Sequence, residues 1–258
     1  MGKRSIEFLH RVRDHELRAV MRHLRPGARV LEIGGGTGYQ AGRLAEGGFR
    51  VTSIDVGVTQ YKRRRVFPVI EYDGVGFPFR DATFDVVFSS SVLEHVADLG
   101  QLHRESRRVL KPGGYCLHVM PSAVWRLWES VTHYVELVQR WSAQSRLLLP
   151  RRWSCKELHR AWRAVRKMVY LGREYAAVPR HGATGNAVTE LWTFSRRRWV
   201  RHFLRHHFTV IRAEPIGLFY TGHMVCGNRW GLPSRERAAR VLGAAAILYV
   251  VQPGPALP

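Results

Sequence analysis

Short apolar runs alternate with helix-period apolar stripes along the first half of the chain. Residues 5–24 place apolar side chains near one face and predict an amphipathic helix. Apolar runs bounded by polar or glycine-rich turns then predict buried strands over residues 30–33, 51–55 and 115–120, and residues 84–95 read as a further strand followed by a helix. Because strands that alternate with helices imply a parallel sheet with right-handed crossovers, this half of the chain predicts an α/β unit.

The pattern changes near residue 123, and all eight tryptophans lie beyond that position. Apolar stripes predict a helix over residues 124–141 and another that ends at Gly172. Ser154 and Glu157 have the spacing of a capping box that would open this second helix. We therefore expect one domain over residues 1–258, with residues 123–190 as a helical, lid-like insertion. The later elements predicted from the same patterns are a helix over 197–206 and strands over 208–211 and 246–251.

The first predicted strand runs into a glycine-rich turn with the pattern Glu-x-Gly-x-Gly-x-Gly, from Glu32 to Gly38. Glycines at 34, 36 and 38 have no Cβ, so the backbone can turn sharply and lie against a ligand. The helix that begins at Tyr39 would present its free N–H groups at the same place. Dinucleotide-binding folds use a similar loop. A carboxylate at Glu32 would repel a pyrophosphate, however, and suits a ligand that carries an ammonium group.

This turn and four later segments resemble, in order, the motifs of class I S-adenosylmethionine-dependent methyltransferases. The four segments are residues 51–55, 71–74, 84–95 and 108–114. The resemblance is closest to the UbiE/UbiG-like (methyltransferase type 11) group, which mostly methylates small molecules. It implies a Rossmann-like fold: a seven-stranded, mostly parallel sheet with helices on both faces, an antiparallel last strand and, here, a helical insertion after strand five.

The same resemblance implies S-adenosyl-L-methionine as the cofactor. Asp55 ends a strand, where ligands of α/β proteins bind, and matches the acid that holds the ribose hydroxyls in the family. Asp73 matches the residue that meets the adenine amino group, although Tyr-Asp-Gly is also an ordinary turn. The cofactor-binding residues expected from the resemblance are Glu32, Gly34, Gly36, Gly38, Asp55, Asp73, Gly74 and Ser89.

Three histidines are candidates for catalysis or acceptor binding. His95 lies at the mouth of the fourth strand, and the pKa of an imidazole suits it to take a proton from a hydroxyl. The alternative is a helix residue with a solvated ring. His133 and His181 are polar positions in aromatic surroundings on the insertion, and the alternative for both is capping or loop hydrogen bonding. No cluster of ligands has metal spacing in the sequence, so we expect no metal.

Net charge and cysteine content limit which partners and which cellular compartment we expect. The net charge of +21, carried mainly by arginine, fits either a solvated surface or an anionic partner: nucleic acid, phospholipid or a phosphorylated substrate. Cys116, Cys155 and Cys226 are far apart, which argues against a disulfide framework or a structural zinc site and favours a reducing cytoplasm. We also expect no signal peptide and no membrane span.

The function expected from the resemblance is methyl transfer to a small molecule, such as a sugar or a lipid-linked intermediate, by O-methylation. An RNA methyltransferase is the alternative, but residues 89–92 lack the Asn/Asp-Pro-Pro-aromatic motif of amino-methylating enzymes. A non-catalytic binding module is a third class. The basic, tryptophan-rich insertion further predicts contact with an anionic membrane or a phosphorylated substrate, which would place the protein in the cytoplasm at the inner membrane surface. A soluble lid whose tryptophans pack on the sheet is the alternative.

Overall fold

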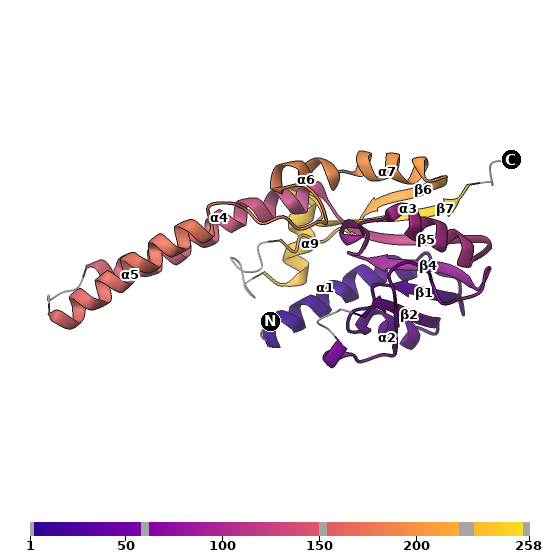
Figure 1. The fold of residues 1–258 in the computed structure, drawn as a ribbon, viewed down its shortest axis with the longest axis horizontal. Coiled ribbons are helices and arrows are strands. Elements are labelled where there is room, and N and C mark those ends of the chain that lie inside the picture. Colours follow the sequence, from indigo (N-terminus) through magenta and orange to yellow (C-terminus); the bar gives the residue numbers. More distant parts are fainter. Residues whose placement is uncertain (1–2, 58–61, 150–153, 222–229, 255–258) are drawn as a thin grey trace.

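The computed structural model describes residues 3–57, 62–149, 154–221 and 230–254, and Figure 1 shows how they are arranged. Seven strands form one sheet in the order β3-β2-β1-β4-β5-β7-β6. Neighbouring strands among the first five are parallel, whereas β7 is antiparallel to both β5 and β6. The mostly parallel, Rossmann-like class I methyltransferase fold is thereby confirmed. The strands are β1 (Arg29–Ile33), β2 (Arg50–Val56), β3 (Val69–Tyr72), β4 (Phe84–Ser90), β5 (Leu110–Pro121), β6 (Phe208–Pro215) and β7 (Ala246–Pro253).

Helices cover both faces of this sheet (Figure 1). They are α1 (Lys3–Met21), α2 (Tyr39–Glu46), α3 (Leu99–Val109), α4 (Ala123–Ser145), α5 (Cys155–Glu174), α6 (Ala187–Thr193), α7 (Arg196–Arg205) and α9 (Leu232–Leu242). Three 3₁₀ turns are η1 (Lys62–Arg64), η2 (Leu93–His95) and η3 (Arg146–Leu148). Among the helices that the structure describes, none is both long and apolar enough to cross a bilayer.

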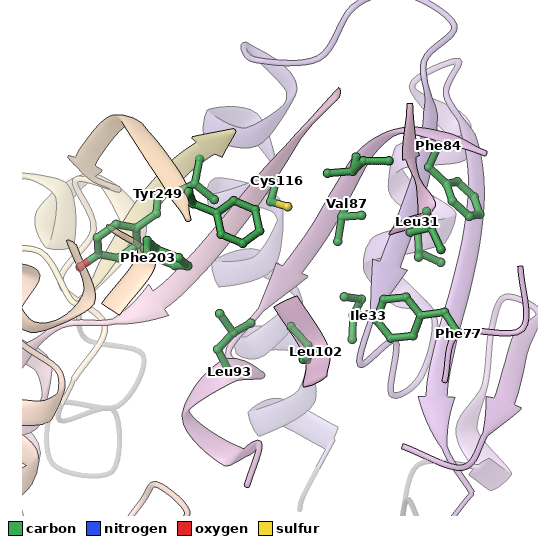
Figure 2. Close-up of a cluster of buried hydrophobic side chains, with 14 of the residues drawn as sticks. Leu31, Ile33, Phe77, Phe84, Val87, Leu93, Leu102, Cys116, Phe203 and Tyr249 are labelled. Carbon is green, nitrogen blue, oxygen red and sulfur yellow. The ribbon is translucent and has the colours of Figure 1, made fainter. Parts of the chain in front are cut away.

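The core consists of one apolar layer on each face of the sheet. Because successive side chains of a strand point to opposite faces, Leu31 and Ile33 contribute to one layer and Val30 to the other. Figure 2 shows the first layer, in which α3 and α7 supply Leu102 and Phe203. The second layer packs under α1 and α2. This two-sided burial is the reason that the central strands read as continuous apolar runs.

The cysteines agree with the expectation of free thiols as far as the structure describes them. Cys116 is buried in the first apolar layer (Figure 2), and Cys155 is exposed at the start of α5; both are free. Cys226 lies outside the described residues.

The second helix of the insertion begins as predicted but ends later. The Ser154 hydroxyl accepts a hydrogen bond from the backbone N–H of Glu157, which confirms the N-cap. The predicted stop at Gly172 is wrong, because α5 continues to Glu174. A Cβ at Gly172 would lie 3.2 Å from the ring of Trp141 on α4. Gly172 therefore allows close approach of two helices instead of ending one of them.

The α4 and α5 helices form a hairpin that extends away from the sheet (Figure 1). A buried ion pair joins its base to α6, with 2.8 Å between Arg126 Nε and Glu190 Oε2 and both side chains almost inaccessible. Nη2 of Arg126 also donates a hydrogen bond to the carbonyl of Pro179. The base of the hairpin is thus anchored firmly, and its role as a lid stays a prediction.

Removing one partner of this ion pair should destabilise the fold strongly. In Glu190→Ala the Arg126 guanidinium would be left buried without its counter-ion, which costs about 3–5 kcal/mol. Urea unfolding followed by far-UV circular dichroism measures the change. The control is Glu46→Ala, which removes an exposed pair with Arg43 and should cost less than about 1 kcal/mol. Equal losses in the two variants would contradict the anchoring role.

Glu32 on β1 makes the free energy of unfolding depend on pH. Glu32 is buried and accepts a hydrogen bond of 2.6 Å from the Ser53 hydroxyl, and its burial raises the pKa of its carboxyl from 4.5 to about 7. Between these two values the folded protein binds the proton more tightly than the unfolded chain does. The stabilising effect of protonation is therefore complete below about pH 4.5 and lost as the pH rises through about 7.

Compared with Glu32→Gln, the parent should lose stability across this window by at most about 1.4 kcal/mol per pH unit. The measurement is the urea midpoint of both proteins at the two ends of the window. Glu7→Gln, which changes an exposed acid on α1, should show no such divergence from the parent. A difference between parent and Glu32→Gln that is independent of pH would show that the carboxyl is ionised throughout.

Candidate functional site

A cavity of about 890 Å³ opens where the parallel strands β1, β2 and β4 end. This edge is where the ligand sites of open α/β sheets lie. The glycine-rich turn after β1 and the end of β2 form one side, and the segment after β4 forms the other. Its lining includes Gly34, Gly36, Asp55, Tyr72, Gly74, Val75, Ser91 and His95.

The turn after β1 requires glycine for two independent reasons. Gly34 and Gly38 have φ angles of 73° and 75°, in the left-handed region that glycine adopts without a Cβ penalty. A Cβ on Gly34 would also lie 2.4 Å from the nearest methyl of Val92, and one on Gly38 would lie 2.8 Å from Cβ of Phe67. The glycine pattern therefore reflects both the backbone conformation and the close approach of two neighbouring segments.

The backbone N–H groups of this turn are used within the protein. Gly34 and Gly35 both donate to the carbonyl of Ile54, and Gly38 donates to the carbonyl of Gly35. Gly36 donates to a carboxylate oxygen of Asp55 over 2.7 Å. A pyrophosphate site needs free N–H groups and no nearby anion. This turn instead presents a carboxylate, which fits a ligand with hydroxyls and a positive charge, as S-adenosyl-L-methionine has.

Asp55 and the segment around Asp73 lie on the same side of the cavity. Asp55 lines it directly, as expected for a residue that holds ribose hydroxyls. The carboxylate of Asp73 accepts hydrogen bonds from the N–H groups of Val75 and Gly76, which lower its pKa. It shapes a turn whose residues Gly74 and Val75 line the cavity, while Asp73 itself does not. A contact between Asp73 and adenine stays a prediction.

Gly38 and His181 do not line the cavity, and neither do three other predicted site residues. Glu32 lies beneath the glycine turn, because it points toward β2 and bonds Ser53. Ser89 is buried in β4, where its hydroxyl lies 2.8 Å from Nδ1 of His118 on β5. His133 lies on α4, with its ring stacked on Tyr175 of α5. The first two support the strands from inside the sheet, and the third holds the hairpin together.

The other two histidines meet beside the cavity although 86 positions separate them in the chain. The ring centroids of His95 and His181 are 5.0 Å apart. Their Nε2 atoms lie 3.8 and 3.9 Å from Oε1 of Glu94. Glu94 is buried, and neither of its carboxylate oxygens has a hydrogen-bond partner. The tertiary structure thus assembles a Glu94–His95–His181 cluster beside the cavity, across from the glycine-rich turn.

Burial shapes the protonation of this cluster. It raises the pKa of Glu94 to about 7 and lowers the pKa of His95 below its ordinary value. The pKa of His181 falls to about 4, through burial and the neighbouring His95. Both imidazoles are therefore neutral near pH 7, so each retains a nitrogen that can accept a proton.

Backbone contacts determine where His181 lies. Oε1 of Glu190 accepts hydrogen bonds of 2.7 Å from the N–H groups of His181 and Gly182, while its other oxygen pairs with Arg126. The N–H of Ala183 donates to the carbonyl of Glu94. The ion pair at the base of the hairpin thus also positions a histidine of the site.

The same three side chains could coordinate a cation. One ligand atom from each of Glu94, His95 and His181 lies within 4.8 Å of the others. Two imidazoles and a carboxylate are donors that suit a transition metal. No spacing in the sequence predicts this group, because His181 lies 86 positions after His95. The absence of a metal stays a prediction.

Sequence reasoning missed the polar residues that α1 brings to the far side of the cluster. Arg13 donates to Oε2 of buried Glu16 over 2.6 Å and to the hydroxyl of Ser90 over 2.8 Å. Ser91, which has a φ of 54°, lines the cavity next to them. Arg13 and Glu16, three positions apart, lie on one face of a predicted amphipathic helix, but only contact with the end of β4 distinguishes them from surface charges.

Comparison with known proteins agrees with this geometry. Residues 31–118 match the family model of a methyltransferase domain, type 11. Over 93 residues the chain is 40% identical to a demethylmenaquinone methyltransferase of Corynebacterium urealyticum, with 35% of this chain and 40% of the relative covered. Over 107 residues it is 38% identical to the 27-O-demethylrifamycin SV methyltransferase of Amycolatopsis mediterranei, with 37% and 39% covered.

The fold comparison extends over nearly the whole chain. The S-adenosylmethionine-dependent methyltransferase of Mesorhizobium loti shares the fold with a TM-score of 0.51 and 15% identity, covering 92% of this chain and 97% of that one. The chain spans about two fifths of the length of the two curated relatives named above. With its motifs in register on the Rossmann-like class I methyltransferase fold, this chain carries a methyltransferase domain of type 11 in residues 31–118.

Proposed function

We propose that this protein transfers a methyl group from S-adenosyl-L-methionine to a hydroxyl of a small-molecule acceptor. The observation that carries the proposal is that one cavity joins the cofactor side, with Gly36 and Asp55, to an imidazole side, with His95. A catalyst of methyl transfer must hold donor and acceptor in contact and in line. The shared cavity meets that requirement.

The residues of the first side fit the cofactor. Asp55 would accept hydrogen bonds from the ribose hydroxyls, and the turn at Gly34 and Gly36 would lie against the amino-acid portion. Tyr72 and Val75 would cover the adenine. When bound, S-adenosyl-L-methionine supplies a methyl group already activated by a sulfonium sulfur, so the protein mainly has to supply alignment.

The second side favours an acceptor rich in hydroxyl groups. Both oxygens of Glu94 and Oε1 of Glu16 are buried without a hydrogen-bond donor. Buried carboxylate oxygens need donors, and an alcohol supplies O–H groups that a purely apolar acceptor lacks. A sugar or a lipid-linked intermediate that carries one belongs to this class.

The proton of the acceptor hydroxyl needs a destination. As the bond between sulfur and the methyl carbon breaks and a bond between the acceptor oxygen and that carbon forms, His95 takes the hydroxyl proton. Its imidazole is neutral because burial lowers its pKa. Glu94, whose Oε1 lies 3.8 Å from Nε2 of His95, stabilises the imidazolium that results.

The names of the two curated relatives support a small-molecule acceptor, and one of them specifies an oxygen position. An RNA acceptor is the competing proposal, favoured by the net charge of +21. Filter binding of a mixed-sequence RNA at increasing salt separates the two: tight binding with a steep salt slope, together with methylated RNA, would replace the small-molecule proposal.

Asp55→Ala should weaken binding of S-adenosyl-L-methionine at least about tenfold. The variant loses a carboxylate that both accepts from the ribose and orders the turn through the N–H of Gly36. Loss of a hydrogen bond to a charged group costs about 1.5–3 kcal/mol. Isothermal titration calorimetry measures the affinity, with exposed Glu7→Ala as the control. Unchanged affinity in Asp55→Ala would show that the ribose site lies elsewhere.

His95→Asn should lower kcat/KM for methyl transfer about 10²–10⁴-fold while cofactor affinity is kept. The measurement is release of S-adenosylhomocysteine with a panel of hydroxylated acceptors, and His159→Asn, on the exposed face of α5, is the control. Activity of the parent should rise with pH through the lowered pKa of His95, and the variant should lack this limb.

Two results would overturn the proposal in different ways. If no acceptor of any class releases S-adenosylhomocysteine although the cofactor binds, the chain is a binding module. If exhaustive chelation abolishes turnover and a divalent metal restores it, the Glu94–His95–His181 cluster is a metal site and His95 is not the base. We expect turnover to survive chelation.

A further inference from the structure

The hairpin of α4 and α5, called the arm below, exposes apolar side chains in two regular stripes. It is held together by polar and aromatic contacts between the helices, such as the bond of 3.0 Å from Trp141 Nε1 to the carbonyl of Met168. In the orientation of Figure 1 it projects well beyond the sheet. The stripes are Leu127, Val131, Tyr134 and Val138 on α4, and Leu158, Trp162, Val165 and Val169 on α5; between 42% and 63% of each residue is exposed.

Both stripes lie on the same face of the arm. The stripe on α4 lies one position after residues that contact the other helix, as Tyr134 follows His133, and on α5 Val169 likewise follows Met168. One position is a rotation of about 100° around a helix. Because the two helices are antiparallel, equal rotations in sequence turn both stripes toward the same side. The arm therefore carries one continuous apolar face that the described protein leaves uncovered.

The rest of the arm is strongly basic. Lys156, Arg160, Arg163 and Lys167 precede inward-facing positions of α5 and so lie on the opposite face, while the Arg166 guanidinium lies 4.7 Å from the ring centroid of Trp162. Between residues 140 and 173 the only acidic residue is Glu157. The basic residues of this stretch are Arg140, Arg146, Arg151, Arg152, Lys156, Arg160, Arg163, Arg166, Lys167 and Arg173; Arg151 and Arg152 lie outside the described residues.

This combination restricts what can cover the apolar face. A second copy packed on this face would leave the basic side chains of both arms on the outside, without an anionic partner. A bilayer with anionic lipids satisfies both features at once. Its acyl boundary takes Leu, Val and Trp side chains, and its phosphates attract flexible Lys and Arg side chains that reach around the helix.

We propose that the apolar face of the arm docks in the plane of an anionic bilayer surface, with the basic side chains of α5 on lipid phosphates. This inference does not depend on the reaction that the cavity performs. It gives the protein a peripheral membrane position and brings an acceptor carried by a lipid within reach of the same molecule.

The test is co-sedimentation of the full chain with vesicles of phosphatidylcholine containing phosphatidylglycerol. Trp162→Gln, Val165→Gln and Val169→Gln combined remove three of the eight apolar side chains of this face, at positions that are already about half exposed. We expect the partition coefficient to fall at least about tenfold, since each buried CH₂ contributes about 0.8 kcal/mol. The matched control combines Val188→Gln, Leu204→Gln and Val241→Gln, three exposed apolar residues off the arm, and should sediment like the parent.

A second variant tests the charge. Arg160→Gln, Arg163→Gln and Lys167→Gln combined should lower binding to anionic vesicles by at least tenfold, and the parent should bind pure phosphatidylcholine far more weakly than the anionic mixture. Circular dichroism and cofactor affinity confirm that all variants are folded. Sedimentation of the apolar variant equal to that of the parent overturns the proposal. The proposal is also overturned if light scattering shows that the parent is a dimer and that the apolar variant is a monomer, because the face would then be covered by a second copy.

Discussion

The cavity depends on how the turn after β1 is tied to the end of β2. Two N–H groups of that turn share the carbonyl of Ile54, and a third binds the carboxylate of Asp55. The turn can lie this close only because Gly34 and Gly38 have positive φ angles and no Cβ. The same bonds engage three N–H groups of the turn and place a carboxylate beside it, which disfavours a phosphate, so one local constraint influences both the shape of the site and the kind of ligand it suits.

Buried charge is concentrated on the side of the cavity opposite this turn. There, Glu94 has no hydrogen-bond donor, whereas Glu190, also buried, forms an ion pair with Arg126 and accepts hydrogen bonds from two backbone N–H groups. The contrast separates two functions of a buried acid. Glu190 holds the chain in place, and Glu94 keeps unused acceptor capacity beside His95, where an acceptor molecule can employ it.

The arm shows a different use of apolar surface. Within the sheet domain, apolar stripes on helices are covered by strands, as with Leu102 of α3 and Phe203 of α7. On α4 and α5 the same helical periodicity produces a face that remains open, because only the neighbouring face of each helix is used to form the hairpin. Contiguous apolar patches on a protein surface usually mark a place of interaction.

The sequence by itself determined the order of strands and helices, the glycine turn and Asp55, because these follow from local periodicity and from backbone conformations that few residues adopt. Only the tertiary structure decided that Ser89 contacts His118 inside the sheet, that His133 stacks on Tyr175, that α5 continues past Gly172, and that His181 meets His95 at Glu94. Those facts depend on contacts between residues far apart in the chain. Periodicity indicates which side of a helix is apolar, but what lies against that side depends on where the helix is anchored. Here the anchoring contacts at the base of the arm include the ion pair between Arg126 and Glu190 and the hydrogen bond from Trp128 to the carbonyl of Leu242.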